Sequence, residues 1–171
     1  QENNYSVEYR YLHDNLGSNF RITEMQSAIG RIQLKKLNSW RNIRTRNAKI
    51  IYNILGNINT VRVPLPNDNF VHAWYKFNCF IEIKYLKNDW DRKKIIKAIR
   101  SKDLPAFQGS CSELYLEKCF SKNGDHKYKE LPISKELGQT NLTFLVHPTI
   151  SENEMIFYAE NIKEVLISAT K

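Results

Sequence analysis

The stretch 17-GSNFRITEMQSAIGRIQLKKL-37 begins with a short polar cluster and continues directly into a long amphipathic pattern. Thr23 and Gln26 have the spacing of a capping box, in which the hydroxyl accepts a first-turn amide and the glutamine reaches back to the cap. Apolar residues then recur every three to four positions until Gly56, a natural helix stop. We therefore expect one helix over residues 23–56, and a helix this long should pack against more protein than this chain supplies.

Downstream of this helix, residues 57–171 alternate between short apolar runs and helical signals. The runs predict three strands, at residues 75–83, 104–108 and 142–146. Capping residues and breakers predict helices at residues 89–101, 110–120 and 132–137, and a last helix from the capping box of Ser151 and Glu154. This order favours an α+β fold, with a three-stranded, mainly antiparallel sheet that helices cover on one side.

Composition narrows the function classes. The 171 residues carry 26 basic and 18 acidic side chains, a net charge of +8, and the lysines are dispersed rather than grouped in a block. Dispersed charge indicates a solvated surface, so a nucleic-acid-binding module is the weaker alternative. Three cysteines without a Cys-x-x-Cys pair and four scattered histidines predict no metal site and a reducing, cytoplasmic setting. No apolar run reaches the ~20 residues of a membrane span.

The polar cluster before the long helix is a candidate phosphate site. A helix N-terminus offers unpaired amides and the positive end of a dipole, and Asn19 and Arg21 add an amide and a guanidinium beside it. The alternative is structural, with Asn19 serving the turn after Gly17 and Arg21 pairing with a surface acid. The residues alone leave both readings open.

Four stretches, in order, resemble one enzyme family. They are "GSNFRITEMQSAIGRIQLKKLNSW", "RNIRTRNAKIIYNIL", "FQGSCSELYLEKCF" and "LGQTNLTFLVHPTISENEM". Together they are similar to segments of the DegT/DnrJ/EryC1/StrS aminotransferases, which use pyridoxal phosphate to aminate keto sugars carried on nucleotides. The resemblance covers almost the whole chain.

The resemblance implies the small C-terminal domain of a fold-type-I enzyme. Residues 1–22 would be a linker from an absent large domain, 23–56 a connecting helix and 57–171 the small α+β domain. Family members form homodimers in which the segment equivalent to Asn19 and Arg21 reaches the cofactor phosphate bound by the partner subunit. The resemblance therefore implies that these two residues are cofactor-binding in the complete enzyme.

The same resemblance implies substrate contacts and a missing nucleophile. His72 and Tyr75 lie in an aromatic stretch that approaches the sugar nucleotide in the family, and Ser110 could line the same pocket, although a capping role explains it equally well. Nothing here matches the upstream stretch with the Schiff-base lysine, so we expect no catalytic residue and no cofactor bound by this chain alone.

We therefore expect the C-terminal part of a cytoplasmic, pyridoxal-phosphate-dependent sugar-nucleotide aminotransferase of surface-polysaccharide biosynthesis. Whether the chain works in an enzyme depends on a partner, either an upstream domain or a separate half-chain. The alternative within the same family is a non-catalytic remnant without a partner.

Overall fold

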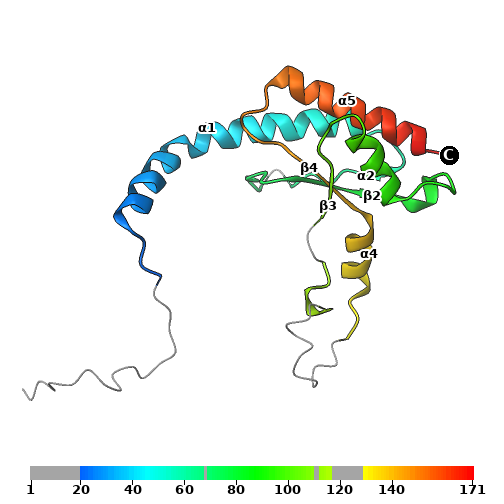
Figure 1. The fold of residues 1–171 in the computed structure, drawn as a ribbon, viewed down its shortest axis with the longest axis horizontal. Helices are drawn as coiled ribbons and strands as arrows, with labels where there is room; N and C mark the ends of the chain where they lie inside the picture. Colours follow the sequence, from blue (N-terminus) through cyan, green and yellow to red (C-terminus); the bar gives the residue numbers. More distant parts are fainter. Residues whose placement is uncertain (1–19, 68, 110–111, 117–128) are drawn as a thin grey trace, which may run out of the picture. The chain divides into compact units, whose positions relative to one another are not determined.

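The structure is a computed structural model that describes residues 20–67, 69–109, 112–116 and 129–171 (Figure 1). The chain divides into two compact units, Gln1–Lys36 and Leu37–Lys171. The second unit contains the sheet and most of the helices, and each unit is described by itself below.

The long helix forms where the capping box and the apolar periodicity place it. Helix α1 spans Glu24–Leu55. The backbone N–H of Thr23 donates to Oε1 of Gln26 at 2.9 Å, and that of Gln26 donates to the Thr23 hydroxyl at 3.3 Å. At the other end, the N–H of Gly56 donates to the Tyr52 carbonyl at 2.8 Å. The predicted helix and its capping box are confirmed.

The sheet has four strands rather than the expected three. Its strands are β1 (Val61–Arg62), β2 (Phe77–Ile81), β3 (Phe107–Gln108) and β4 (Asn141–Phe144). They lie in the order β1-β2-β4-β3, and every neighbouring pair is antiparallel. The extra strand is β1, which pairs with the outer edge of β2 through only two residues. Two residues are too short to show an alternating pattern in the sequence.

Three further helices complete the described fold. They are α2 (Arg92–Arg100), α4 (Pro132–Thr140) and α5 (Glu152–Ala169). Helix α2 starts later than predicted because Asp91 caps it, accepting the N–H of Lys94 at 2.7 Å. Helix α4 runs past Gly138, where it was expected to stop. Of the helix predicted at 110–120, the described residues contain a 3-10 turn at Leu114–Leu116.

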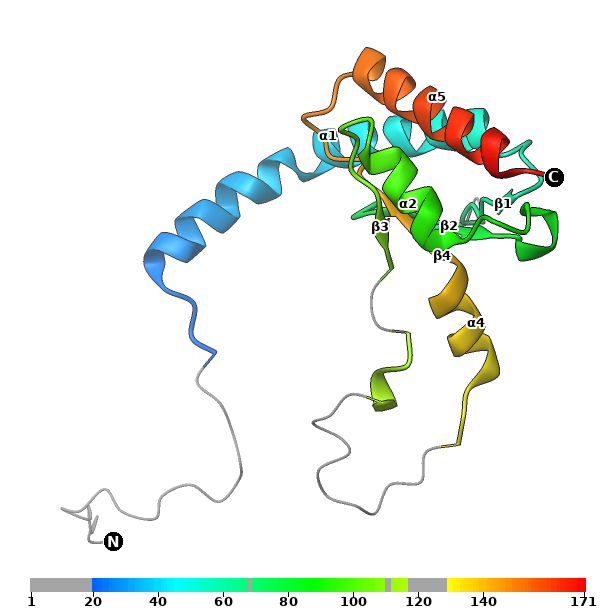
Figure 2. The same cartoon turned by 45° about the vertical axis from the view of Figure 1, so that its right-hand side comes forward.

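The core lies on one face of the sheet. Residues 37–55 of α1, with α2 and α5, lie on that side, whereas α4 lies on the other (Figures 1 and 2). Alternate side chains of β2 and β4 point into the core, and the buried cluster joins them to the helices. Its fully buried members include Ile51, Leu55, Phe77, Ile95, Leu142, Phe144, Met155, Ile162 and Leu166. The expected α+β arrangement with helical cover is thus confirmed, but the expectation that helices lie on one side alone is corrected by α4.

The search for membrane-spanning helices covers the described residues, and among these no helix combines the length and the apolar character that a bilayer crossing requires.

Candidate functional site

The connection before β2 contains a strained turn, residues 72–75, which we call the tryptophan turn. Trp74 has a φ of 49°, in the left-handed region, although it is a large non-glycine residue. Such a conformation costs about 1–3 kcal/mol and persists only where its surroundings impose it. The Trp74 side chain is buried, whereas His72 and Tyr75 on either side of it are exposed.

Several contacts hold the tryptophan turn. Nη1 of Arg44, on α1, donates to the carbonyls of Trp74 at 3.0 Å and of Tyr75 at 3.1 Å. The N–H of Trp74 donates to Nδ1 of His72 at 2.9 Å, so this ring nitrogen acts as the acceptor. The Trp74 ring lies 4.3 Å from that of His72 and stacks on Phe77 at 5.7 Å, measured between centroids.

Two hollows flank Trp74 within the second unit. The first is a groove of about 430 Å³, with Trp40, Arg41, Arg44, Val71 and Tyr75 among its lining residues. Aromatic walls with two guanidinium groups suit a planar or sugar ring that carries negative charge.

The second hollow, of about 260 Å³, is lined by Thr45, Lys49, Phe70, His72 and Trp74 among others. It too combines aromatic side chains with a cationic one. The tryptophan turn therefore contributes one exposed polar aromatic side chain to each hollow, Tyr75 to the first and His72 to the second.

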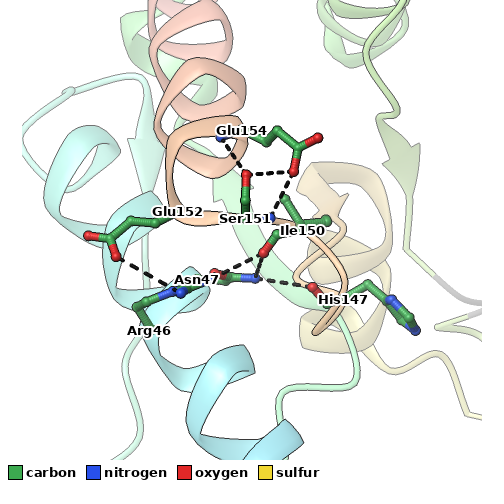
Figure 3. Close-up of polar contacts among 7 residues, drawn as sticks. All are labelled: Arg46, Asn47, His147, Ile150, Ser151, Glu152 and Glu154. Atoms are coloured by element: carbon green, nitrogen blue, oxygen red, sulfur yellow. Dashed lines mark hydrogen bonds and ion pairs between the residues drawn. The ribbon is translucent and has the colours of Figure 1, made fainter.

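A buried amide fixes the part of α1 that supports this turn (Figure 3). Asn47 is fully buried, and its Nδ2 donates to the carbonyls of His147 at 3.1 Å and Ile150 at 3.4 Å. Nη2 of Arg46 donates to Asn47 Oδ1 at 2.9 Å and to the Ile150 carbonyl at 3.1 Å. Nη1 of Arg46 also forms an ion pair with Oε2 of Glu152 at 3.9 Å. These bonds tie α1 to the connection between β4 and α5.

Helix α5, which follows this connection, begins with a capping box formed by Ser151 and Glu154. The hydroxyl of Ser151 accepts the N–H of Glu154, and the Glu154 carboxylate accepts the Ser151 N–H at 2.8 Å. The ring of His147 contacts the Thr149 hydroxyl at 2.7 Å. His147 is thus a hydrogen-bonded residue at a strand end, as its position before Pro148 predicts.

The predicted site residues fall into three groups. Asn19 and Ser110 lie outside the described residues. Arg21 is exposed in the first unit, just ahead of α1. His72 and Tyr75 both lie on the tryptophan turn but line different hollows, His72 the second and Tyr75 the first.

Sequence reasoning missed Arg44 and Asn47, although a signal was present. Both lie on or beside the apolar stripe that continues through Ala48, Ile51 and Leu55, spaced three or four residues apart. A polar side chain on the buried face of a helix must find hydrogen-bond partners there, because leaving it unpaired is costly. Such residues identify the places where other segments dock.

The most strongly shifted titratable groups lie away from the two hollows. Complete burial raises the pKa of the Cys79 thiol far above its usual range, which makes this cysteine an inert core residue. Burial likewise raises the pKa of Tyr158, whose hydroxyl donates to the Pro105 carbonyl. Within the described part of the chain, no group of three or more acidic, histidine or cysteine side chains could hold a metal ion.

Comparisons with known proteins bear on the family and the fold of this chain. Residues 3–162 match the DegT/DnrJ/EryC1/StrS aminotransferase family. The chain is 38% identical to the aminotransferase from Psychrobacter cryohalolentis, with a TM-score of 0.83 over 96% of this chain and 44% of that one. It is 25% identical to GDP-perosamine synthase of Escherichia coli O157:H7, over 93% of this chain and 40% of that protein.

A structure that contains the cofactor has the same fold. The E. coli GDP-4-keto-6-deoxy-D-mannose-3-dehydratase with bound hydrated PLP matches 88% of this chain and 36% of its own length, at 21% identity and a TM-score of 0.71. This chain thus spans well under half the length of these three relatives. It belongs to the DegT/DnrJ/EryC1/StrS aminotransferase family, whose members depend on pyridoxal phosphate, and it corresponds to the C-terminal portion of their structures.

Proposed function

We propose that this chain is the C-terminal part of a pyridoxal-phosphate-dependent aminotransferase that acts on a nucleotide-linked keto-deoxysugar in surface-polysaccharide biosynthesis. The observation that carries the proposal is the match to an aminotransferase at 38% identity and a TM-score of 0.83 over 96% of the chain. The name of a second relative, GDP-perosamine synthase, gives an amino sugar carried on a nucleotide, which supports this substrate class.

In this proposal the chemistry is shared between two parts of the enzyme. Pyridoxal phosphate supplies an electron sink for amino-group transfer, and a large domain carries the lysine that holds it. That domain is either upstream in the same polypeptide or a separate half-chain, and the complete enzyme is a homodimer. The chain alone then binds no cofactor and transfers no amino group.

The segment before α1 would contact the cofactor phosphate of the partner subunit. The exposed guanidinium of Arg21 fits this role, because a phosphate oxygen accepts charge-assisted hydrogen bonds from arginine. Asn19 would donate through its side-chain amide. Arg21, the described member of this pair, therefore has the chemistry to hold the phosphate end of the cofactor.

The tryptophan turn would contact the substrate. Tyr75 lies beside Arg41 and Arg44 in the larger groove, and this pairing of a ring with cations suits the diphosphate and sugar of a nucleotide sugar. His72 lies in the second hollow with Lys49. Ser110 would add a hydroxyl to the same region. These side chains would bind and orient the substrate, while the large domain carries the reacting groups.

A chimera tests the proposal with the full chain. Residues 1–171 would replace the corresponding C-terminal portion of the P. cryohalolentis aminotransferase. We expect the chimera to show the absorbance of bound pyridoxal phosphate and to transfer an amino group from glutamate to a nucleotide-linked keto sugar, whereas residues 1–171 alone do neither. A dimeric chimera that binds the cofactor and turns over no nucleotide sugar would contradict the proposal.

Variants of the chimera test the phosphate contact. Asn19→Ala and Arg21→Ala should each weaken pyridoxal phosphate binding about tenfold or more, because a hydrogen bond to a charged group contributes about 1.5–3 kcal/mol. Arg31→Ala is the matched control, since it removes an exposed arginine from the same unit two turns into α1. If all three variants bound pyridoxal phosphate as tightly as the unsubstituted chimera does, neither Asn19 nor Arg21 would contact the phosphate.

A further inference from the structure

The left-handed backbone of Trp74 needs an external support. At a φ of 49°, a residue with a large side chain is strained, and the free chain would return to negative φ. Glycine would adopt this conformation without strain, yet a buried tryptophan occupies the position. The surrounding contacts must therefore supply at least the lost free energy.

Arg44 supplies the polar support that comes from outside the turn, beside the stacking of Trp74 on Phe77. Its Nη1 donates to two successive backbone carbonyls, that of Trp74 at 3.0 Å and that of Tyr75 at 3.1 Å. A return of Trp74 to negative φ would redirect these carbonyls and break both bonds. The remaining polar support, from His72 Nδ1 to the Trp74 N–H, is local and would move with the turn.

Buried hydrogen bonds fix the part of α1 that carries Arg44. It is half-buried on α1, three residues before Asn47, whose amide is bonded to the connection between β4 and α5. Since Asn47 is fully buried, this part of the helix cannot shift without breaking buried hydrogen bonds. The buried bonds of Asn47 thus hold the helix that carries Arg44, and the Arg44 guanidinium in turn holds the two carbonyls of the turn.

From these contacts we infer that Arg44 is a positioning residue, which holds the tryptophan turn in its left-handed form and thereby places Tyr75 and His72 in their two hollows. Its consequence for substrate binding rests on the proposed function, whereas its effect on the backbone does not. One guanidinium then controls both hollows together, because the two side chains lie on either side of the same strained residue.

The backbone effect is tested by NMR on the full chain, labelled with ¹⁵N at tryptophan and histidine. Arg44→Met should shift the backbone amide signal of Trp74 and should change the His72 ring signals away from the unprotonated Nδ1 pattern. Arg44→Lys should restore these signals in part, because an ammonium can still donate to one or both carbonyls. Arg41→Met is the matched control, since it removes a charge from the same groove without a bond to the turn.

Unchanged Trp74 and His72 signals in Arg44→Met would overturn the inference. Should this variant fail to fold, as judged by circular dichroism, Arg44→Gln carries the test, because it keeps a polar side chain that is too short to reach both carbonyls. Wild-type Trp74 and His72 signals in the glutamine variant would then overturn the inference.

The functional effect is measured in the chimera. Arg44→Met should raise the KM for the nucleotide sugar about tenfold, with a much smaller change in kcat and unchanged cofactor absorbance, and Arg44→Lys should lie between it and the wild type. A wild-type KM in Arg44→Met would overturn the positioning role in binding. A chimera without any turnover would instead contradict the proposed function, and the NMR result would stand by itself.

Discussion

Residues 24–36 and residues 37–55 belong to one helix, yet their apolar side chains have opposite surroundings. In the first part Met25, Ile29 and Ile32 are 78%, 58% and 54% exposed, whereas Ile51 and Leu55 in the second are fully buried. Both parts have the same three-to-four spacing. Periodicity and caps are therefore enough to form the helix, but burial requires a partner, and exposed apolar stripes of this kind mark protein contacts.

The largest expected difference between the two parts of α1 comes from truncating one isoleucine in each. Ile51→Ala should lower the free energy of unfolding by about 3 kcal/mol, because it removes buried methyl groups and leaves a cavity. Ile29→Ala, a chemically identical change at an exposed site, should alter it by less than about 0.5 kcal/mol. Urea denaturation of residues 1–171 measures both. Equal losses would show that the first part is packed as tightly as the second.

A second test concerns the buried polar anchor of the second part, Asn47. Asn47→Ala should destabilise the chain by about 2 kcal/mol, because the carbonyls of His147 and Ile150 each lose one donor and Arg46 loses an acceptor. Asn42→Ala, at an exposed position of the same helix, should change stability by less than about 0.5 kcal/mol. The same denaturation experiment compares them. If Asn47→Ala proved as mild as its control, the docking of α1 would rest on apolar packing alone.

The smallest expected effect distinguishes the two capping boxes. Hydrogen bonds from the hydroxyl and the N–H of Ser151 hold the pKa of Glu154 below its ordinary value of 4.5, whereas the equivalent residue of the first box, Gln26, does not titrate. A lowered folded pKa gives stability that is present above pH 4.5 and is lost as pH falls through the folded pKa. Acid should therefore weaken the cap of α5 and leave that of α1 intact.

Thermal unfolding at pH 7 and pH 3.5 measures this acid sensitivity. Glu154→Gln should lose less stability between the two pH values than the wild type, since its cap no longer titrates. Glu136→Gln, which changes a glutamate of α4 away from any capping box, is the control and should retain the wild-type pH difference. A Glu154→Gln variant with undiminished acid sensitivity would mean that this carboxylate contributes nothing to it.

Local signals in the sequence predicted most of the fold. The caps at Thr23 and Ser151 located two helices, and the alternation before Ile81 located the central strand β2. The two-residue strand β1 was missed because its pairing depends on β2 rather than on its own pattern. Gly138 was taken as a stop, yet α4 continues through it, because hydrogen bonds and packing can outweigh a weak local propensity.

The candidate site was predicted less completely. His72 and Tyr75 were identified through family resemblance, but their separation into two hollows depends on the left-handed φ of Trp74. That conformation is imposed by Arg44, thirty residues earlier in the chain. Contacts between residues so far apart in the sequence leave no local pattern. A charged residue on the apolar stripe of a predicted helix nevertheless indicates that another segment packs there.

The hydrogen bond between Asn47 and the His147 carbonyl joins residues 100 positions apart, which has a consequence for synthesis on the ribosome. At about 5–20 residues per second, the amide waits about 5–20 s for its acceptor to be made. Until then the apolar stripe of α1 has neither α5 nor β4 to cover it. The nascent chain therefore exposes this apolar stripe before the segments that cover it exist, and a chaperone would protect it during that interval.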